Sequence, residues 1–308
     1  MTFDHRAITR RTWLAGSALA LAGFSSTSRA DDALGAIRAK GRKAGMDPFE
    51  VFESKNFLAI GDATPRYCRE ALDVCEAVAI DYQKHFKDKG FELDWPKDRM
   101  TVVVLASPQS YAAFEGGFVD QVIGGHYDLG ENRLVTFDAR LRDSKSKAGS
   151  LIPEEDNTLQ LVHETIHLLT FNTGLLDRKA DVPDLVSEGL ATYGETWRPR
   201  RKGAIGANNL RRLQGFRKEQ KPGGVTWIPF DQLLADDKII NDDKTQQVGY
   251  FEAWRFVHKM MSNPGRAAKF RGYLQALKGA TEPARRAEVA REHLGDLSAL
   301  DKELRSPR

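Results

Sequence analysis

The sequence predicts an α+β protein, with a mixed α/β N-terminal half that contains a small sheet and a mainly helical C-terminal half. Three observations predict this class. The apolar, β-branched run 100–106 is typical of a buried strand. Segments 125–127 and 133–138, on either side of the turn 130–132, have the pattern of a β-hairpin. From about residue 155 onward the apolar residues recur at helical spacing.

The N-terminal half begins with residues 31–54, which are polar and basic without a clear apolar period, so we expect a lead-in segment. Residues 57–61 predict a short strand, and residues 64–86 predict a helix. The apolar stripe of that helix consists of Leu72, Cys75, Ala79, Tyr82 and Phe86. Pro108 then opens a short helix over 107–114, because proline is favoured in the first turn.

Cys68 and Cys75 are the two cysteines of the chain, and both fall in the helix predicted over 64–86. Seven residues of helix separate them by roughly 10 Å, whereas a disulfide needs Cα atoms within about 7 Å. We therefore expect two unpaired thiols, and their spacing does not predict zinc ligation.

The C-terminal half is broken at several glycines and prolines, which predict the ends of helices. These breaks fall near Gly174, Pro199, residues 222–224 and Pro264. The Ser/Lys-rich stretch 143–150 predicts an exposed loop. We expect one domain over 55–305, with an α/β lobe over about 55–172 and a helical lobe over about 173–305.

Residues 1–30 have the pattern of a removable export signal. Arg10 and Arg11 precede the apolar run 13–24, and small residues at 28–30 offer a cleavage site. This resembles the twin-arginine signal of bacteria, which implies the twin-arginine export machinery as a partner and a periplasmic or secreted protein. A membrane helix is the alternative. Twelve residues, however, rise only about 18 Å against a hydrocarbon core of about 30 Å, so we expect no stable membrane span after processing.

The net charge of the chain is +3, from 46 basic and 43 acidic residues. Residues 1–30 carry this surplus, with four arginines and one aspartate, so residues 31–308 are neutral overall. The composition therefore does not indicate nucleic-acid or membrane binding. One local basic region comprises Arg198, Arg200, Arg201, Lys202, Arg211, Arg212, Arg217 and Lys218. It is either a solvated helix face or a surface for an anionic substrate or cell-envelope polymer.

The segment His163-Glu164-Thr165-Ile166-His167 matches the HExxH zincin motif, in which two histidines bind zinc from one helix. At 100° per residue, His167 lies about 40° from His163 and Glu164 about 100°, so the three side chains can reach one cleft. The flanking residues are apolar, and polar groups in a buried helix are costly unless they are paired or bind a cation. A chance match with hydrogen-bonded core histidines is the alternative.

A second helix is predicted over 181–193, with Asp181 as N-cap and Pro183 in its first turn. It places Glu188 twenty-one residues after His167. A carboxylate on a following antiparallel helix would complete a His₂Glu site and leave a fourth position for water. The small Gly189 and Ala191 would let the two helices approach closely. The alternative for Glu188 is an ordinary surface glutamate.

The pair HETIH and SEGLATYGE resembles the gluzincin (HExxH...E) clan of zinc metallopeptidases, and more narrowly the peptidase MA-like bacterial domain family of unassigned function. The resemblance covers roughly residues 55–305. It implies a zincin-like fold with an active-site helix and a peptide or protein substrate. It also implies a Zn²⁺ ion held by His163, His167 and Glu188, with Glu164 as general base.

A donor to the oxyanion is also expected. Tyr250 is the first candidate, because related enzymes often place a tyrosine or histidine beyond the glutamate helix. His126, Tyr127 and Tyr193 are weaker candidates. For Tyr250 the alternative is core packing.

The residues that orient the ligands depart from the family pattern. Many gluzincins have an acid four residues after the glutamate ligand, where this chain has Thr192. Glu195 or Asp184 could take that place. Segment 133–138 is either the sheet edge that aligns an extended substrate or an ordinary hairpin strand.

Two other functions stay open. One is a noncatalytic, zinc-stabilised binding or scaffold protein of the cell envelope, and the other is a zinc hydrolase that acts on a non-peptide bond. Glu164 argues against the scaffold, since a structural zinc needs no adjacent base. It does not separate a peptidase from another hydrolase.

Overall fold

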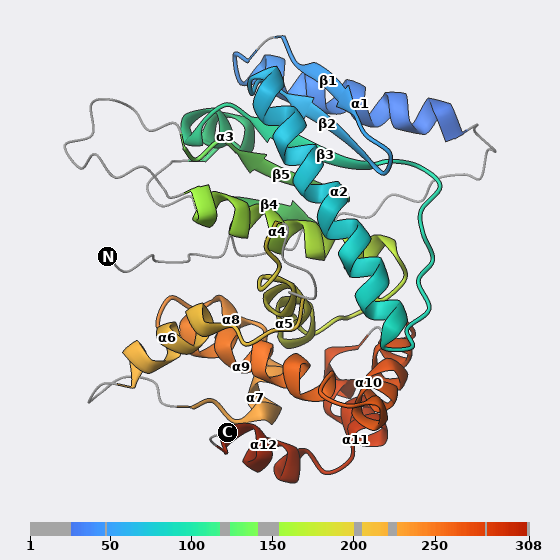
Figure 1. Cartoon of the computed structure of the whole chain (residues 1–308), viewed down its shortest axis with the longest axis vertical. Coiled ribbons are helices and arrows are strands. Elements are labelled where there is room, and N and C mark those ends of the chain that lie inside the picture. Colours follow the sequence, from blue (N-terminus) through green and yellow to red (C-terminus); the bar gives the residue numbers. More distant parts are fainter. Residues whose placement is uncertain are drawn as a thin grey trace.

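A small mixed sheet and a group of helices make up the two predicted halves of the molecule, which confirms the α+β class (Figure 1). The computed structural model describes residues 26–46, 48–117, 124–140, 154–199, 205–220, 227–280 and 282–306. In Figure 1 the sheet lies in the upper half and helices α6 to α12 lie in the lower half. Helices α4 (Glu154–Asn172) and α5 (Asp184–Gly194) lie between them.

The sheet has five strands in the order β1-β2-β3-β5-β4. They are β1 (Glu50–Glu53), β2 (Phe57–Gly61), β3 (Met100–Leu105), β4 (Gly125–Asp128) and β5 (Arg133–Phe137). The central strands β2, β3 and β5 run parallel, and the edge strands β1 and β4 pair antiparallel to their neighbours. The strands predicted at 57–61 and 100–106 and the hairpin of 125–127 with 133–138 are thus confirmed.

Of the two alternatives for 133–138, the structure supports the ordinary hairpin strand, because the edge of the sheet on this side is β4. All five residues of β5 are buried, and the strand pairs with β3 on one side and β4 on the other. Strands buried on both faces belong in the middle of a sheet. The alternation of residue types in 133–138 therefore did not reflect alternating exposure.

Helices cover both faces of the sheet. Val102, with α2 (Pro65–Asp88) and α4, belongs to the larger apolar cluster on one face. Val103 points the other way, because successive side chains of a strand alternate, and it joins a smaller cluster. That cluster includes residues of α1 (Ser26–Lys43) and α3 (Pro108–Glu115). The sheet thus separates two apolar layers.

Residues 31–54 are part of the folded domain and not a lead-in to it. They contain most of α1 and all of β1, which pairs with β2. Ile37, Met46 and Phe49 are buried in the smaller cluster. These apolar residues are too few and too unevenly spaced to produce a periodic pattern, which is why the sequence did not reveal them. The predicted export signal falls mainly on residues outside the described ranges; the last five, 26–30, begin α1.

Helix α2 confirms the stripe predicted over 64–86. Thr64 caps it by accepting a hydrogen bond from the Tyr67 backbone, and Pro65 begins the first turn. All five residues of the predicted stripe are buried. Cys68 and Cys75 are free and buried on this helix, as expected.

The helical half is formed by seven helices after α5, within the described ranges. They are α6 (Leu210–Glu219), α7 (Phe230–Ala235), α8 (Lys238–Asn241), α9 (Gln246–Met260), α10 (Pro264–Leu277), α11 (Arg286–Leu294) and α12 (Leu297–Arg305), with a 3₁₀ turn (Pro283–Arg285) before α11. The predicted loop 143–150 and the break at 222–224 lie outside the described residues. Across the part of the chain that the structure describes, no helix is both long and apolar enough to cross a membrane.

Helix α5 packs chiefly against α9 and α4. Its Gly189 faces α9: a Cβ there would lie 2.7 Å from the Ala253 carbonyl oxygen. Gly194 is the glycine that faces α4, where a Cβ would lie 2.4 Å from Ile166 Cγ1. The expectation that Gly189 lets α5 approach the HExxH helix is therefore corrected. Gly189 sets the contact with α9, and Gly194 sets the contact with α4.

The start of α5 also differs from the prediction. Pro183 is the N-cap residue and has no capping side chain, and the backbone N–H of Asp184 donates instead to Asp237 Oδ1 at 2.8 Å. Asp181 instead pairs with the buried Arg286 at 2.6 Å. That arginine also binds Asp237 at 2.9 Å. Asp181 thus forms an ion pair with a residue 105 positions away instead of capping α5. Sequence spacing could not reveal this pairing.

Candidate metal centre

The HExxH segment lies on α4, as predicted. The helix is continuous from Glu154 to Asn172 and ends before Gly174, which has a φ of 76° that glycine adopts without strain. Val162, Ile166 and Leu169 are buried in the larger cluster and anchor the helix. The motif residues are therefore held on a rigid element inside the molecule.

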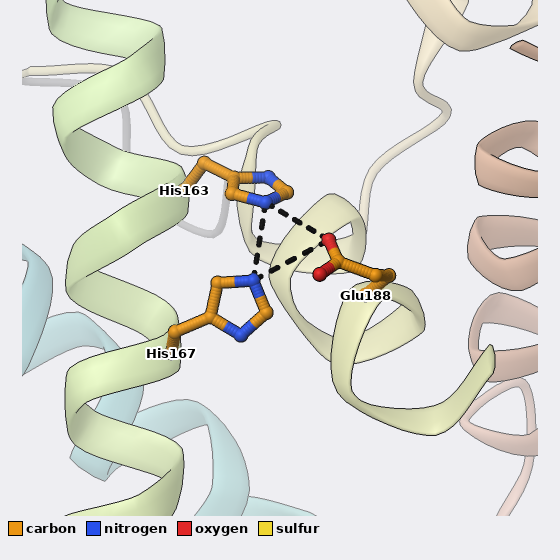
Figure 2. A group of neighbouring side chains, drawn as sticks. All are labelled: His163, His167 and Glu188. Carbon is orange, nitrogen blue, oxygen red and sulfur yellow. Dashed lines mark hydrogen bonds and ion pairs between the residues drawn. The ribbon is translucent and has the colours of Figure 1, made fainter. Parts of the chain in front are cut away.

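His163, His167 and Glu188 converge from α4 and α5 (Figure 2). The two Nε2 atoms are 3.2 Å apart. Glu188 Oε2 lies 3.2 Å from Nε2 of His163 and 3.4 Å from Nε2 of His167. An ion with tetrahedral bonds of about 2.0–2.2 Å requires neighbouring ligand atoms about 3.3–3.6 Å apart. The three atoms form a triangle close to this size, so these residues could hold a metal ion.

The electrostatics of the site also suit a cation. Burial alone would lower the pKa of His163, but its hydrogen bonds with Glu188 and Glu195 raise that pKa to about 10. Burial would raise the pKa of Glu188, but the two histidines hold it well below its usual value. Glu164 adds a third carboxylate to those of Glu188 and Glu195, whereas among the described residues Arg212 is the arginine that pairs with one of these carboxylates. The centre carries surplus negative charge, which favours a divalent cation.

Glu195, one of the two residues expected to orient a ligand histidine, contacts His163. Its Oε1 lies 2.7 Å from Nδ1 of His163. A carboxylate on one ring nitrogen leaves the other nitrogen to face a metal. Asp184, the other alternative, accepts a hydrogen bond from Asn241 at 2.8 Å at the opposite end of α5. Thr192 donates to the backbone oxygen of Glu188 at 2.6 Å and so supports the helix that carries this glutamate.

Arg212 and Asn209 belong to the site, although the sequence placed Arg212 in a surface basic region. Arg212 is 5% exposed, and its Nε lies 3.0 Å from Glu195 Oε2 while Nη2 donates to Oε1. Asn209 donates to Glu195 Oε2 at 2.9 Å. Arg217 and Lys218 of the same basic region are exposed, and residues 200–202 lie outside the described ranges. No local pattern separates the buried arginine from its exposed neighbours.

Glu164 is buried next to His163 and is held by Gln160, one turn earlier on α4. Gln160 Nε2 donates to Glu164 Oε1 at 2.6 Å. Gly124 packs on this pair, because a Cβ there would lie 2.3 Å from Gln160 Cγ. The start of β4 therefore lies directly against the HExxH helix. The role of Gln160 was not predicted, although a polar residue four positions before the motif glutamate is a usable signal in the sequence.

Tyr250 of α9 is brought to the same site. Its ring centroid is 6.2 Å from that of His163, and the Arg212 guanidinium lies 4.6 Å above its ring. Burial, with the negative charge of Glu188, raises the pKa of Tyr250 well above its usual value, so the hydroxyl keeps its proton. Within the described residues this hydroxyl makes no hydrogen bond. It is available as a donor.

The three weaker oxyanion candidates have other contacts. The Tyr193 hydroxyl lies 3.0 Å from Nε2 of His85. Tyr127 donates to Asn132 at 2.7 Å, and its ring stacks parallel to that of His167 with centroids 6.3 Å apart. His126 Nδ1 lies 2.6 Å from the hydroxyl of Tyr111. Of the three, Tyr127 contacts His167, but its hydroxyl is already used in the bond to Asn132.

Part of the chain is similar to a known family. Residues 157–279 are similar to a family described as a protein of unknown function (DUF1570). The matched range contains the three possible metal ligands together with Glu164, Glu195, Asn209, Arg212 and Tyr250. No curated protein matches the chain.

Proposed function

We propose that this chain is a zinc-dependent hydrolase that cleaves peptide bonds, a metallopeptidase of the gluzincin type. The observation that carries the proposal is the triangle of His163, His167 and Glu188, with Glu164 beside it on the same helix. Two imidazoles and one carboxylate are the ligand set of a catalytic zinc with an open fourth position.

The choice of zinc is supported by the donor atoms. Imidazole nitrogens suit Zn²⁺, whereas Ca²⁺ and Mg²⁺ prefer a shell of oxygen atoms. The spacing of the three ligand atoms fits tetrahedral bonds. When bound, zinc supplies a Lewis acid that activates water and polarises a carbonyl group.

The residues of the chain then have separate roles. Glu164 accepts a proton from the attacking water and delivers it to the leaving amine, while Gln160 holds its carboxylate. Tyr250 donates a hydrogen bond to the oxygen that gains negative charge. Glu195 keeps the His163 ring in its ligating orientation.

The edge strand supports a peptide as the substrate. β4 pairs with β5 on one side and has no strand on its other side in the described sheet. Tyr127 of β4 stacks on the ligand His167, so this free edge lies next to the centre. An extended peptide can add to such an edge through backbone hydrogen bonds. A hydrolase of a small non-peptide substrate has no need of that edge.

A noncatalytic zinc-stabilised scaffold is less well supported. A structural zinc is usually enclosed by four protein ligands, and the described residues supply three. Such a site also gives no reason to bury Glu164 beside the ligands and to hold it with Gln160.

We further propose that the protein is exported. The twin arginines, the apolar run and the small residues within 1–30 support a twin-arginine signal and a periplasmic or secreted location. Residues 31–308 are neutral overall, so their charge gives no support for a nucleic-acid partner.

Metal analysis and a peptide-library digest of the purified protein test this function. We expect about one zinc per chain and cleavage that a chelator abolishes. Glu164→Gln should keep the zinc and lose about 10²–10⁴-fold in kcat, because the general base is gone. Glu292→Gln, at an exposed position of α11, is the matched control and should behave like the wild type. A protein without zinc, or equal turnover by Glu164→Gln and the wild type, would refute the proposal.

A further inference from the structure

The contacts of Arg212 reach both sides of the metal centre. We propose that Arg212 is a positioning residue, which acts through Glu195 on the ligand His163 and through its guanidinium face on Tyr250. This inference rests on the proposed function, because it concerns how the same centre is held.

The carboxylate of Glu195 is held by donors on both of its oxygens. Oε1 faces Nδ1 of His163 at 2.7 Å and accepts from Nη2 of Arg212. Oε2 accepts from Nε of Arg212 at 3.0 Å and from Nδ2 of Asn209 at 2.9 Å. The arginine therefore binds both oxygens at once, which fixes the plane of the carboxylate as well as its position.

This orientation matters because Glu188 of α5 and its C-cap residue Glu195 contact the two ring nitrogens of His163. Glu188 and Glu195 are seven residues apart, which is about two helical turns, so both lie near the same face of the helix. Glu188 Oε2 contacts Nε2 of His163, and Glu195 Oε1 contacts Nδ1. If Glu195 rotates, the ring loses the partner that directs Nε2 toward the metal.

Helix α6 supplies the arginine from its first turn. Asn209 caps α6 by accepting from the Arg212 backbone at 3.2 Å. The same side chain donates to the Thr192 carbonyl oxygen at 3.0 Å. The start of α6 is therefore attached to the end of α5 by the residues that bind Glu195, and Arg212 cannot move independently of the centre.

The second contact of Arg212 is with the candidate oxyanion donor. Its guanidinium carbon lies 4.6 Å from the centroid of the Tyr250 ring, a distance typical of a cation–π interaction. That ring is also 6.2 Å from the ring of His163. One side chain thus restrains a ligand on one side and the proposed donor on the other.

The alternative is a buried ion pair that serves stability alone. Removal of one partner of such a pair is strongly destabilising in either case. A positioning role predicts two further effects, which a purely stabilising ion pair does not. Metal affinity and coordination geometry must change with Arg212, and the change must depend on Glu195.

The test compares Arg212→Met and Arg212→Lys with Arg217→Met in the full chain. Arg217 is an exposed arginine of the same helix and provides the matched control. Zinc affinity is measured by competition with a chromophoric chelator, and geometry from the visible absorption of the Co²⁺-substituted protein. We expect Arg212→Met to weaken zinc binding by about 10–100-fold and to alter the Co²⁺ spectrum. Arg212→Lys, which keeps the charge but loses the bidentate contact, should fall between, and Arg217→Met should match the wild type.

Peptide hydrolysis adds a third readout. A displaced Tyr250 and His163 should lower kcat in Arg212→Met more than they raise KM, because Arg212 is buried and acts through these two residues. Wild-type zinc affinity and an unchanged Co²⁺ spectrum in a folded Arg212→Met protein would overturn the inference.

A double-mutant cycle covers the case in which Arg212→Met does not fold. The pair Glu195→Gln with Arg212→Gln replaces the two buried charges by neutral amides, which avoids a lone buried charge. In the Glu195→Gln background, Arg212→Gln should weaken zinc binding little further. A further loss there as large as the about 10–100-fold expected for Arg212→Met would contradict action through Glu195.

Failure of the inference and failure of the proposed function give different results. If the wild-type protein binds no zinc, the function proposed above is wrong. If it binds zinc but cleaves no peptide, the peptidase assignment fails, while the affinities and Co²⁺ spectra still decide the role of Arg212.

Discussion

Gly189 is adjacent to the proposed ligand Glu188 and touches α9, so enlarging it tests whether helix packing sets the metal geometry. In Gly189→Ala the new Cβ would lie 2.7 Å from the Ala253 carbonyl oxygen and 2.7 Å from Val257 Cγ2. Ordinary contacts between such atoms begin near 3.4 Å. The oxygen belongs to the backbone and cannot rotate away, so α5 and α9 must separate locally by about 0.7 Å.

The energetic terms of this substitution nearly cancel. Overpacking of a filled interface costs about 1–3 kcal/mol, whereas alanine in a helix interior is favoured over glycine by about 1 kcal/mol. We expect the free energy of unfolding of the metal-free protein to fall by about 0–2 kcal/mol. The effect on the site should be larger, because ligand distances tolerate only about 0.2 Å and Glu188 shares the displaced backbone.

The assay pairs a urea titration of the metal-free protein with zinc competition against a chelator. We expect zinc affinity to fall at least about 10-fold while the protein stays folded. Gly272→Ala is the matched control: it is also a helix position, and its nearest contact would be His293 Nδ1 at 3.4 Å. The control should keep wild-type affinity and gain up to about 1 kcal/mol. Wild-type zinc affinity in Gly189→Ala would refute the argument that this contact places Glu188.

Two further predictions concern a buried acid and the support of the base. Burial raises the pKa of Glu252 from 4.5 to about 9, so between about pH 5 and 9 the folded state keeps a proton that the unfolded state releases, and stability falls as the pH rises. Glu252→Gln, which keeps an acceptor for the Ile228 backbone, should flatten that slope and add about 1–3 kcal/mol at pH 8 in urea titrations; identical slopes in both proteins would contradict this. Gln160→Met removes the hydrogen bond to Glu164 and should lower kcat about 10-fold with zinc content unchanged. Unchanged turnover would show that Gln160 has no positioning role.

Local patterns predicted much of the fold and the centre of the site. The stripe of α2 and the β-branched run of β3 depend on neighbours in sequence, and the structure confirms both. The convergence of His163 and His167 follows from one helical turn. Glu188 lies on a second helix, but it follows His167 by only twenty-one residues, so the sequence pattern could still predict its role.

Features that depend on distant partners were not predictable. Asp181 pairs with Arg286 from the end of the chain instead of capping α5. Strand β5 lies inside the sheet because a parallel partner from residues 100–105 covers its free side. Arg212 has other basic residues near it in sequence, and only the packing of α6 on α9 and the contact with Glu195 identify it as buried.

The division of the core into two layers has a consequence for how the protein unfolds. The larger cluster extends from β2 through α4, α5 and α9 to α12, so the sheet half and the helical half share one continuous core. Cooperative units follow such contacts, and we expect these halves to lose amide protection together in hydrogen exchange. The smaller cluster under α1 and α3 lies across the sheet from the proposed metal ligands. Its opening would expose backbone amides there while His163, His167 and Glu188 stay in place.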